Sequence, residues 1–386
     1  MQFRDLKTQY QKLKPQIDQS ILEVLSNANF ISGDQVKELE RQLAEYVGVE
    51  HCITCGNGTD ALTLSLKALK IGAGDAVFVP DFTFFASAEI VALEDATPIF
   101  VDVEKETFNI RAESLRQAVE KVKTEGNLIP KAVIAVDLFG LPANYPKIRE
   151  ITDEYGLYLI EDGAQGFGGR IGEKKACSFG DISTTSFFPA KPLGCYGDGG
   201  AVFTNNDEWA SVIRSLCVHG KGNNKYDNIR IGMNSRLDTI QAAVLQVKLK
   251  AFQEYELDAV NQVAAYYTEH LKELAEVPVV EKGFCSSWAQ YSILLKNTEE
   301  RDALQRYLKE NGIPSMIYYP KSMHDQVAFQ NYPSKVIETP NAEDLCDRVL
   351  ALPMHPYLSK KDINEVVDRI KSFFNNKINA KSQNNQ

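Results

Sequence analysis

The sequence predicts an α/β protein in which a large domain with a mostly parallel sheet precedes a smaller α/β domain. Two observations lead to this prediction. Between residues 48 and 205, short apolar runs rich in β-branched residues alternate with segments of helical periodicity, as in strands joined by crossover helices. Beyond residue 235 the pattern changes to long helices with one short β segment among them.

Seven runs are predicted to be strands, and several are apolar on both faces, as buried parallel strands are. They span residues 51–55, 76–79, 98–101, 132–136, 158–160, 182–187 and 201–203. The helices expected between them cover residues 59–69, 111–122, 143–155 and 207–218, and further helices are expected within residues 1–47.

The second domain is predicted from a long helical stretch that ends near residue 274, a β segment at 291–295, and helices at 299–311 and 359–374. We therefore expect a large domain over residues 1–250 and a small domain over residues 251–375. The tail, residues 376–386, is rich in Asn, Lys and Gln and has little to bury, so it is predicted to be disordered.

Composition limits the partners of this chain. The formal net charge of −10 argues against nucleic acid as a partner, because nucleic-acid-binding proteins are usually basic on at least one face. The most apolar stretch, residues 76–93, is broken by Pro80, Asp81 and Glu89, so no membrane span is expected. The polar N-terminus lacks the apolar core of a secretion signal, which predicts a cytoplasmic protein.

The cysteines and histidines do not predict a metal site. The seven cysteines are odd in number and scattered, which is typical of reduced thiols. Cys52 and Cys55 have the CxxC spacing, but both thiols would not share a face of an alternating strand, and no histidine cluster completes a zinc site.

A glycine-rich turn follows the first predicted strand. Gly56-Asn57-Gly58-Thr59-Asp60-Ala61 lies between a strand and a helix, where free backbone N–H groups and the helix dipole favour a phosphate. The same residues match the dinucleotide fingerprint, which leaves an NAD-dependent oxidoreductase as an alternative. A structural turn without a ligand is the third interpretation.

Three further segments carry candidate chemistry. Glu161-Asp162 ends an apolar strand, and an acid there can cap a helix, bind a metal or pair with a protonated ring nitrogen. Lys191 lies in an apolar turn rich in Pro and Gly, where desolvation lowers the pKa of the amine and frees it to form a Schiff base. Arg236, before the long helix, could clamp a carboxylate or phosphate, although a surface ion pair with capping by Ser235 is the simpler interpretation.

Taken in order, these motifs resemble the sugar aminotransferases of the DegT/DnrJ/EryC1/StrS family. The resemblance covers nearly the whole chain, from Phe3-Arg4-Asp5-Leu6-Lys7 to Leu352-Pro353-Met354-His355-Pro356-Tyr357. It rests on Gly58-Thr59-Asp60-Ala61-Leu62, Phe82-Thr83-Phe84, Glu161-Asp162 with Gln165, Ser186-Phe187-Phe188 with Lys191, Gly197-Asp198-Gly199-Gly200 and Asn234-Ser235-Arg236-Leu237-Asp238. It implies the type I fold of pyridoxal-phosphate (PLP) enzymes, with a seven-stranded sheet, and a homodimer whose two active sites each use both subunits.

The resemblance also implies residue roles. Lys191 would form the Schiff base with PLP and carry the proton, and Asp162 would pair with the pyridine nitrogen. Gln165 would contact the ring, with stacking on its other face by Phe84 or by Phe85. The remaining cofactor contacts are implied for Gly58, Thr59 and Ser186, which would hold the phosphate, for Asp60, and for Asn234 of the other subunit.

The implied reaction moves an amine from L-glutamate to a nucleotide-linked keto-sugar, for a surface glycan. The segment from Thr185 to Gly200 resembles the subgroup that aminates C3 of UDP-linked 2-acetamido-2-deoxy-3-keto-hexuronic acid. Substrate contacts are then implied for Asn29, Phe30, Ile31, Arg236, Tyr318 and Tyr319.

Three alternatives remain open at this point. A dTDP-linked 3-keto sugar or a UDP-linked 4-keto 6-deoxysugar could replace the uronate as substrate. A PLP-binding regulator without catalysis and the NAD-dependent oxidoreductase belong to other functional classes. Family members that dehydrate carry His at the lysine position, so Lys191 favours transamination.

Overall fold

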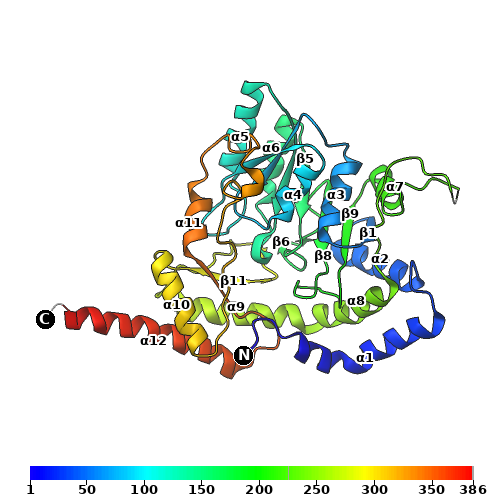
Figure 1. Cartoon of the computed structure of the whole chain (residues 1–386). Coiled ribbons are helices and arrows are strands. Elements are labelled where there is room, and N and C mark those ends of the chain that lie inside the picture. Colours follow the sequence, from blue (N-terminus) through cyan, green and yellow to red (C-terminus); the bar gives the residue numbers. More distant parts are fainter. Residues whose placement is uncertain (225, 385–386) are drawn as a thin grey trace.

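The computed structural model describes residues 1–224 and 226–384, and side chains as far as Lys377. Seven strands form the central sheet in the order β1-β9-β8-β5-β4-β2-β3 (Figure 1). Their bounds are β1 His51–Cys55, β2 Asp75–Pro80, β3 Thr97–Val101, β4 Ile129–Val136, β5 Tyr158–Asp162, β8 Ile182–Ser186 and β9 Gly200–Thr204. Only β9 runs antiparallel to its neighbours in this sheet, so the prediction of a mostly parallel sheet is confirmed.

Helices cover both faces of the sheet. One face buries Val77, Ile134 and Val202 under α3 Gly58–Ala68, α4 Ala86–Leu93 and α7 Asp207–Leu216. The other face packs against α5 Ala112–Glu125 and α6 Tyr145–Tyr155 at one end, and against α2 Asp34–Val47 and α8 Thr239–Ala251 at the other. The result is three layers, which bury the strands on both faces and explain their apolar sequences.

Local signals fix most helix ends close to the predicted positions. Asn57, Asn144 and Asn206 precede α3, α6 and α7, and each side chain accepts a backbone N–H of the first turn. Helix α4 was not predicted. It lies in the apolar run that also contains β2, and because it is buried on nearly all sides its sequence has no helical periodicity.

The long helix after residue 235 is continuous. Helix α8, the π segment η2 Phe252–Glu256 and α9 Leu257–Leu271 run on without a break beneath the sheet domain (Figure 1). Helix α1 Leu6–Asn27 packs along α8. The proposed boundary near residue 250 falls inside this helix, and it stays a prediction.

A separate core joins α9 to the C-terminal elements. It contains buried residues of β11 Tyr291–Leu294, β12 Val349–Leu352, α10 Thr298–Glu310 and α12 Lys360–Asn384. Strand β12 and α11 Pro340–Arg348 were not predicted, because they follow one another directly with no turn residue to separate helix from strand. The short strands β6 Arg170–Ile171, β7 Lys174–Lys175 and β10 Phe284–Cys285 form a small sheet that was also missed.

Helix α12 continues to Asn384, through most of the tail that was predicted to be disordered, and the disorder of this tail stays a prediction. Lys377 forms an ion pair with Glu300 of α10 at 2.5 Å, which ties this part of the helix to the domain. Residues 385–386 lie outside the described residues. All seven cysteines are free, and no helix among the described residues is both long and apolar enough to cross a membrane.

Candidate active site

The predicted site residues gather where β1, β5 and β8 end. These strands lie near one another in the sheet and point the same way, so the residues that follow them meet at one edge. The reversed strand β9 begins at this edge with Gly200, where a Cβ would come within 2.4 Å of the carbonyl oxygen of Asn57. Glycine at this position lets the turn after β1 lie directly against the start of β9.

The turn after β1 forms a small cradle. Asn57 Oδ1 accepts the Asp60 amide at 2.7 Å and so caps α3. Within the described part of the chain, the Gly58 and Thr59 amides have no protein acceptor, as expected in a first helical turn. A Cβ on Gly58 would lie 2.7 Å from Cβ of Ser186, so the Ser186 hydroxyl stands directly beside these amides. Two free amides, a hydroxyl and a helix N-terminus are the groups that bind a phosphate.

Asp162 ends β5 and is 5% exposed. Its Oδ2 accepts a hydrogen bond from Ser87 Oγ at 2.7 Å, and its Oδ1 accepts the Ala164 amide at 3.2 Å. These donors fix the orientation of a buried carboxylate, as a partner for a cationic ring nitrogen requires.

Gln165 is held next to an aromatic group. Its Oε1 accepts the Phe139 amide at 2.6 Å and its Nε2 donates to the Tyr319 hydroxyl at 3.1 Å. The exposed ring of Phe84 lies 6.2 Å from that of Tyr319. Phe85 instead packs on Phe329, with ring centroids 5.3 Å apart, so Phe84 is the ring available to a ligand.

Lys191 lies in the loop between β8 and β9. Burial lowers the pKa of its amine, the charge of Asp162 opposes this shift, and the charge of Arg4 adds to it. A lysine that loses its proton readily is suited to attack a carbonyl group.

Ser235, which was expected to cap α8, instead links the segment before α8 to the cradle. Ser235 Oγ donates to Asp60 Oδ2 at 2.6 Å and accepts the Gly56 amide at 2.9 Å. It does not cap the helix, which starts at Thr239 after Asp238. Arg236 donates to the side chain of exposed Asn234 at 2.6 Å, in place of the expected ion pair.

The remaining predicted residues fall into two places. Asn29, Phe30 and Ile31 are exposed beside the start of α8, where Ile31 bridges Asp238 and the Phe30 carbonyl accepts the Thr239 amide. Tyr318 packs against Phe3, with ring centroids 6.2 Å apart. No hydrogen bond joins Tyr318 or Tyr319 to Arg236 among the described residues.

Sequence reasoning missed Ser87 and the linking role of Ser235. Thr83 and Ser87 have the spacing of one helical turn, and their hydroxyls lie 3.3 Å apart. That spacing could have drawn attention to Ser87 only if α4 had been predicted.

The chemistry of this donor set fits PLP. The cradle would hold the phosphate, Asp162 the ring nitrogen, Phe84 and Gln165 the ring, and Lys191 the aldehyde. Within the described residues, no group of three or more His, Cys, Asp or Glu side chains could hold a metal ion.

Fold and site together define a PLP-dependent aminotransferase, and comparison with known proteins identifies its family. The model of the DegT/DnrJ/EryC1/StrS aminotransferase family matches residues 11–371. The chain belongs to this family and is a PLP-dependent nucleotide-sugar aminotransferase. The family match overturns the alternative of an NAD-dependent oxidoreductase, and the turn at Gly56-Ala61 is assigned to the aminotransferase fold.

Two relatives illustrate the similarity. The chain is 42% identical to UDP-2-acetamido-2-deoxy-3-oxo-D-glucuronate aminotransferase of Pseudomonas aeruginosa, over 94% of this chain and 97% of the relative. It is 39% identical to UDP-N-acetyl-3-dehydro-alpha-D-glucosamine 3-aminotransferase of Acidithiobacillus ferrooxidans, over 95% and 96%.

Solved structures confirm the fold. A family aminotransferase from Brucella abortus superposes with a TM-score of 0.94 at 48% identity, covering 97% of this chain and 99% of that chain. DesV of S. venezuelae gives a TM-score of 0.90 at 32% identity, covering 96% and 98%. The type I fold of PLP enzymes, expected from the resemblance, is therefore confirmed.

Proposed function

We propose that the protein transfers the amino group of L-glutamate to C3 of UDP-linked 2-acetamido-2-deoxy-3-keto-hexuronic acid, to make an amino sugar for a surface glycan. The observation that carries the proposal is the placement of Arg236. Its guanidinium is partly exposed, and its neighbour Ser235 bonds directly to the phosphate cradle. The uronate acted on by the Pseudomonas relative has a carboxylate, for which a guanidinium is the best-matched partner.

The residues of the chain divide the work of transamination. PLP, when bound, supplies an aldehyde that accepts an amine and a ring that takes up electrons. Lys191 offers an amine whose pKa is lowered by burial, and it would take up and return a proton near the reacting carbon. Asp162 would face the ring nitrogen, and hydrogen bonds from the Ser87 hydroxyl and the Ala164 amide hold its carboxylate in place. The amides of Gly58 and Thr59 would hold the phosphate.

Substitution of Arg236 tests the substrate. Arg236→Lys keeps the charge and loses the two-pronged hydrogen bonding, so kcat/KM for the uronate should fall by about tenfold or more. For the matched UDP-linked 3-keto hexose, which has a hydroxymethyl group at C6, it should change less than about threefold. Arg214→Lys, on α7, is the control, because it makes the same chemical change in an arginine that bonds to Glu40.

Equal losses on both sugars would overturn the carboxylate role of Arg236. A dTDP-linked 3-keto or UDP-linked 4-keto 6-deoxysugar then becomes the preferred substrate, and the two can be compared in the same assay. Loss of L-glutamate dependence would separately overturn the amino donor.

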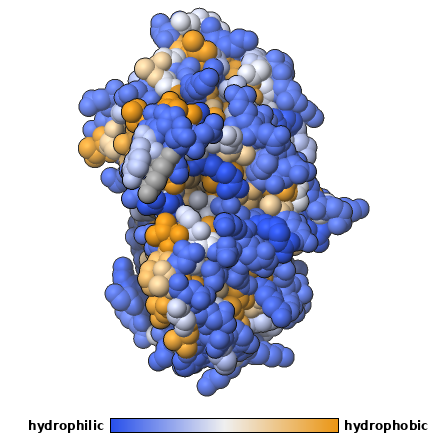
Figure 2. Space-filling view, turned by 90° about the vertical axis from the view of Figure 1, so that its right-hand side faces the viewer, coloured by the Kyte–Doolittle hydropathy of each residue, from blue (hydrophilic) through white to orange (hydrophobic). Residues whose placement is uncertain are grey.

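We infer that the active enzyme is a homodimer with shared sites. Several large apolar side chains are exposed around the site edge and on the loop after α7: Phe30, Ile31, Phe188, Ile229 and Ile231. Figure 2 looks onto the side that carries α7 and shows groups of hydrophobic residues along its left edge. A second copy of the chain would cover such residues. Asn234 and Arg236 lie in the same stretch between α7 and α8 as Ile229 and Ile231.

A further inference from the structure

Arg4 reaches the backbone of the catalytic loop from the N-terminus. Its Nη2 donates to the carbonyl oxygen of Lys191 at 2.9 Å. Its Nη1 lies 3.4 Å from the Ala289 carbonyl oxygen and 3.5 Å from that of Met354, which lie at the same end of the sheet formed by β11 and β12. One side chain therefore joins the N-terminal segment, the lysine loop and the C-terminal elements.

The loop around Lys191 is held from the same side by a second cation. Lys248 of α8 is 1% exposed and donates to the Gly194 carbonyl. Within the loop, the Lys191 amide donates to the Phe188 carbonyl at 2.8 Å. A Cβ on Gly194 would come within 2.5 Å of that same oxygen, so the turn is closely folded. The lysine backbone has little freedom to move.

The charges that face Arg4 leave it positive. Buried Glu256 is its counter-charge, and it also accepts hydrogen bonds from Gln9 and Tyr357. Burial lowers the pKa of Arg4 to about 10, so the guanidinium stays charged at neutral pH. Burial, together with the charge of Arg4, lowers the pKa of His355 to about 4, so that imidazole is neutral.

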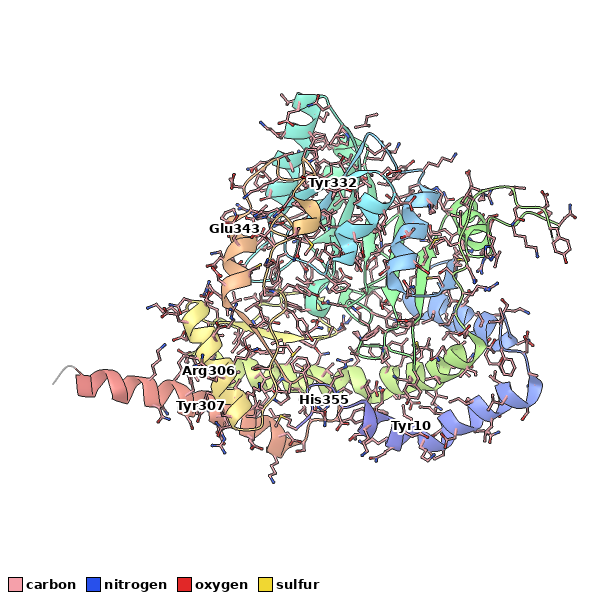
Figure 3. The ribbon with its side chains drawn as sticks, in the orientation of Figure 1. Tyr10, Arg306, Tyr307, Tyr332, Glu343 and His355 are labelled. Carbon is pink, nitrogen blue, oxygen red and sulfur yellow. The ribbon has the colours of Figure 1, made fainter. Side chains whose placement is uncertain are left out.

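His355 lies beneath the long helix, between the C-terminal domain and Tyr10 of α1 (Figure 3). Four other titratable groups lie around Arg4, Lys191 and His355. They are Asp162 at the end of β5, Asp5 of the N-terminal segment, Lys248 of α8 and Tyr318. Asp162 is the only one of these that opposes the effect of Arg4 on the lysine amine.

We propose that Arg4 is a positioning residue for Lys191, because it fixes the carbonyl of the lysine and keeps a positive charge near the amine, which favours the neutral, reactive form. The proposal rests on the proposed function, since it takes Lys191 as the amine that reacts with PLP. A purely structural arginine would hold the loop in place without changing how the amine titrates.

The test measures how fast the full-length protein, freed of cofactor, captures added PLP at a series of pH values. Absorbance reports the capture. Arg4→Met should raise the apparent pKa of the reacting amine, and each rise of one in that pKa should slow capture near neutral pH by roughly tenfold. At a pH above both pKa values the rate should return to that of the wild type. Arg4→Lys keeps the charge and should keep the wild-type profile.

Arg306→Met is the matched control. It removes the same charge from an exposed position on α10, away from His355 in Figure 3, and should leave the profile unchanged. Arg4→Gln, which keeps a donor for the Lys191 carbonyl, replaces Arg4→Met if that variant does not fold. It should show the same change in apparent pKa.

The outcomes distinguish the role of Arg4 from the proposed function. An unchanged pH profile in Arg4→Met or Arg4→Gln, with capture equal to the wild type or slowed equally at every pH, would overturn the role of Arg4 alone. Failure of the wild type to capture PLP, or capture by Lys191→Ala at the wild-type rate, would overturn the proposed function itself.

Discussion

Asp162 shows how one buried side chain depends on its neighbours. Asp162 is 5% exposed, and burying a carboxylate is costly unless hydrogen-bond donors face it. One donor is the backbone amide of Ala164, and the other is the hydroxyl of Ser87 in the first turn of α4. The apolar surroundings strengthen the bond, and they also make its loss costly.

Ser87→Ala should therefore weaken PLP binding more than it weakens the fold. The carboxylate loses a hydrogen bond of about 1.5 kcal/mol or more, which corresponds to roughly a tenfold weaker PLP affinity if Asp162 turns away from the ring. Titration of the cofactor-free protein with PLP measures this. Ser183→Ala is the control, because it removes a serine hydroxyl that donates to a different buried carboxylate, that of Glu161, from the neighbouring strand β8. Equal affinities in Ser87→Ala and the wild type would contradict the positioning of Asp162 by Ser87.

Helix α3 combines two functions in its first turn. Asn57 satisfies the Asp60 amide, while the amides of Gly58 and Thr59 remain available to a phosphate. Helix α7 has the same kind of cap, in which Asn206 accepts the Trp209 amide at 3.0 Å, but it lies outside the site. Comparing the Asn57 and Asn206 caps therefore separates the contribution of a cap to folding stability from its effect on cofactor binding.

Asn57→Ala and Asn206→Ala should each lower the free energy of unfolding by about 1 kcal/mol. Only Asn57→Ala should also weaken PLP binding, because the amides that would hold the phosphate lose their fixed direction. Denaturant unfolding and PLP titration of both variants measure the two effects. Loss of PLP affinity in Asn206→Ala to the same extent would show that the effect arises from general destabilisation.

The strands were easier to predict from the sequence than the buried helix α4. Strands β1 to β5, β8 and β9 were predicted close to their bounds, because buried parallel strands read as short apolar runs between polar turns. Helix α4 was missed for the opposite reason, since an apolar helix next to an apolar strand gives no change of period. The missed helix carries Ser87, so the residue and the element were missed together.

At the scale of the whole molecule, the site residues divide into two sets. Lys191 is influenced by Asp162, and Gln165 binds Tyr319, whereas Arg236 bonds Asn234 at the start of the long helix. In a dimer, the two sets in one active site can come from different subunits. A single sequence contains no direct information on contacts between copies of the chain. The motif resemblance supplied that expectation, and the exposed apolar residues support it.

Mixing two inactive variants tests the shared site. If Lys191 of one subunit works with Asn234 of the other, a hybrid of Lys191→Ala and Asn234→Ala has one site with both lesions and one intact site. Activity should then reappear on mixing and refolding, at up to about a quarter of the wild-type value given random assembly. No recovery, with hybrid dimers verified by mass, would place both residues in the same subunit.

The central claim is that Lys191 binds PLP and that L-glutamate donates the amine. The visible absorption spectrum of the purified protein tests it most directly, alongside that of Lys191→Ala, before and after addition of L-glutamate. We expect the wild type to show the band of lysine-bound cofactor and to lose it with glutamate, and Lys191→Ala to lack this band. Absence of the band from the wild type after incubation with PLP, or its presence in Lys191→Ala, would contradict this claim.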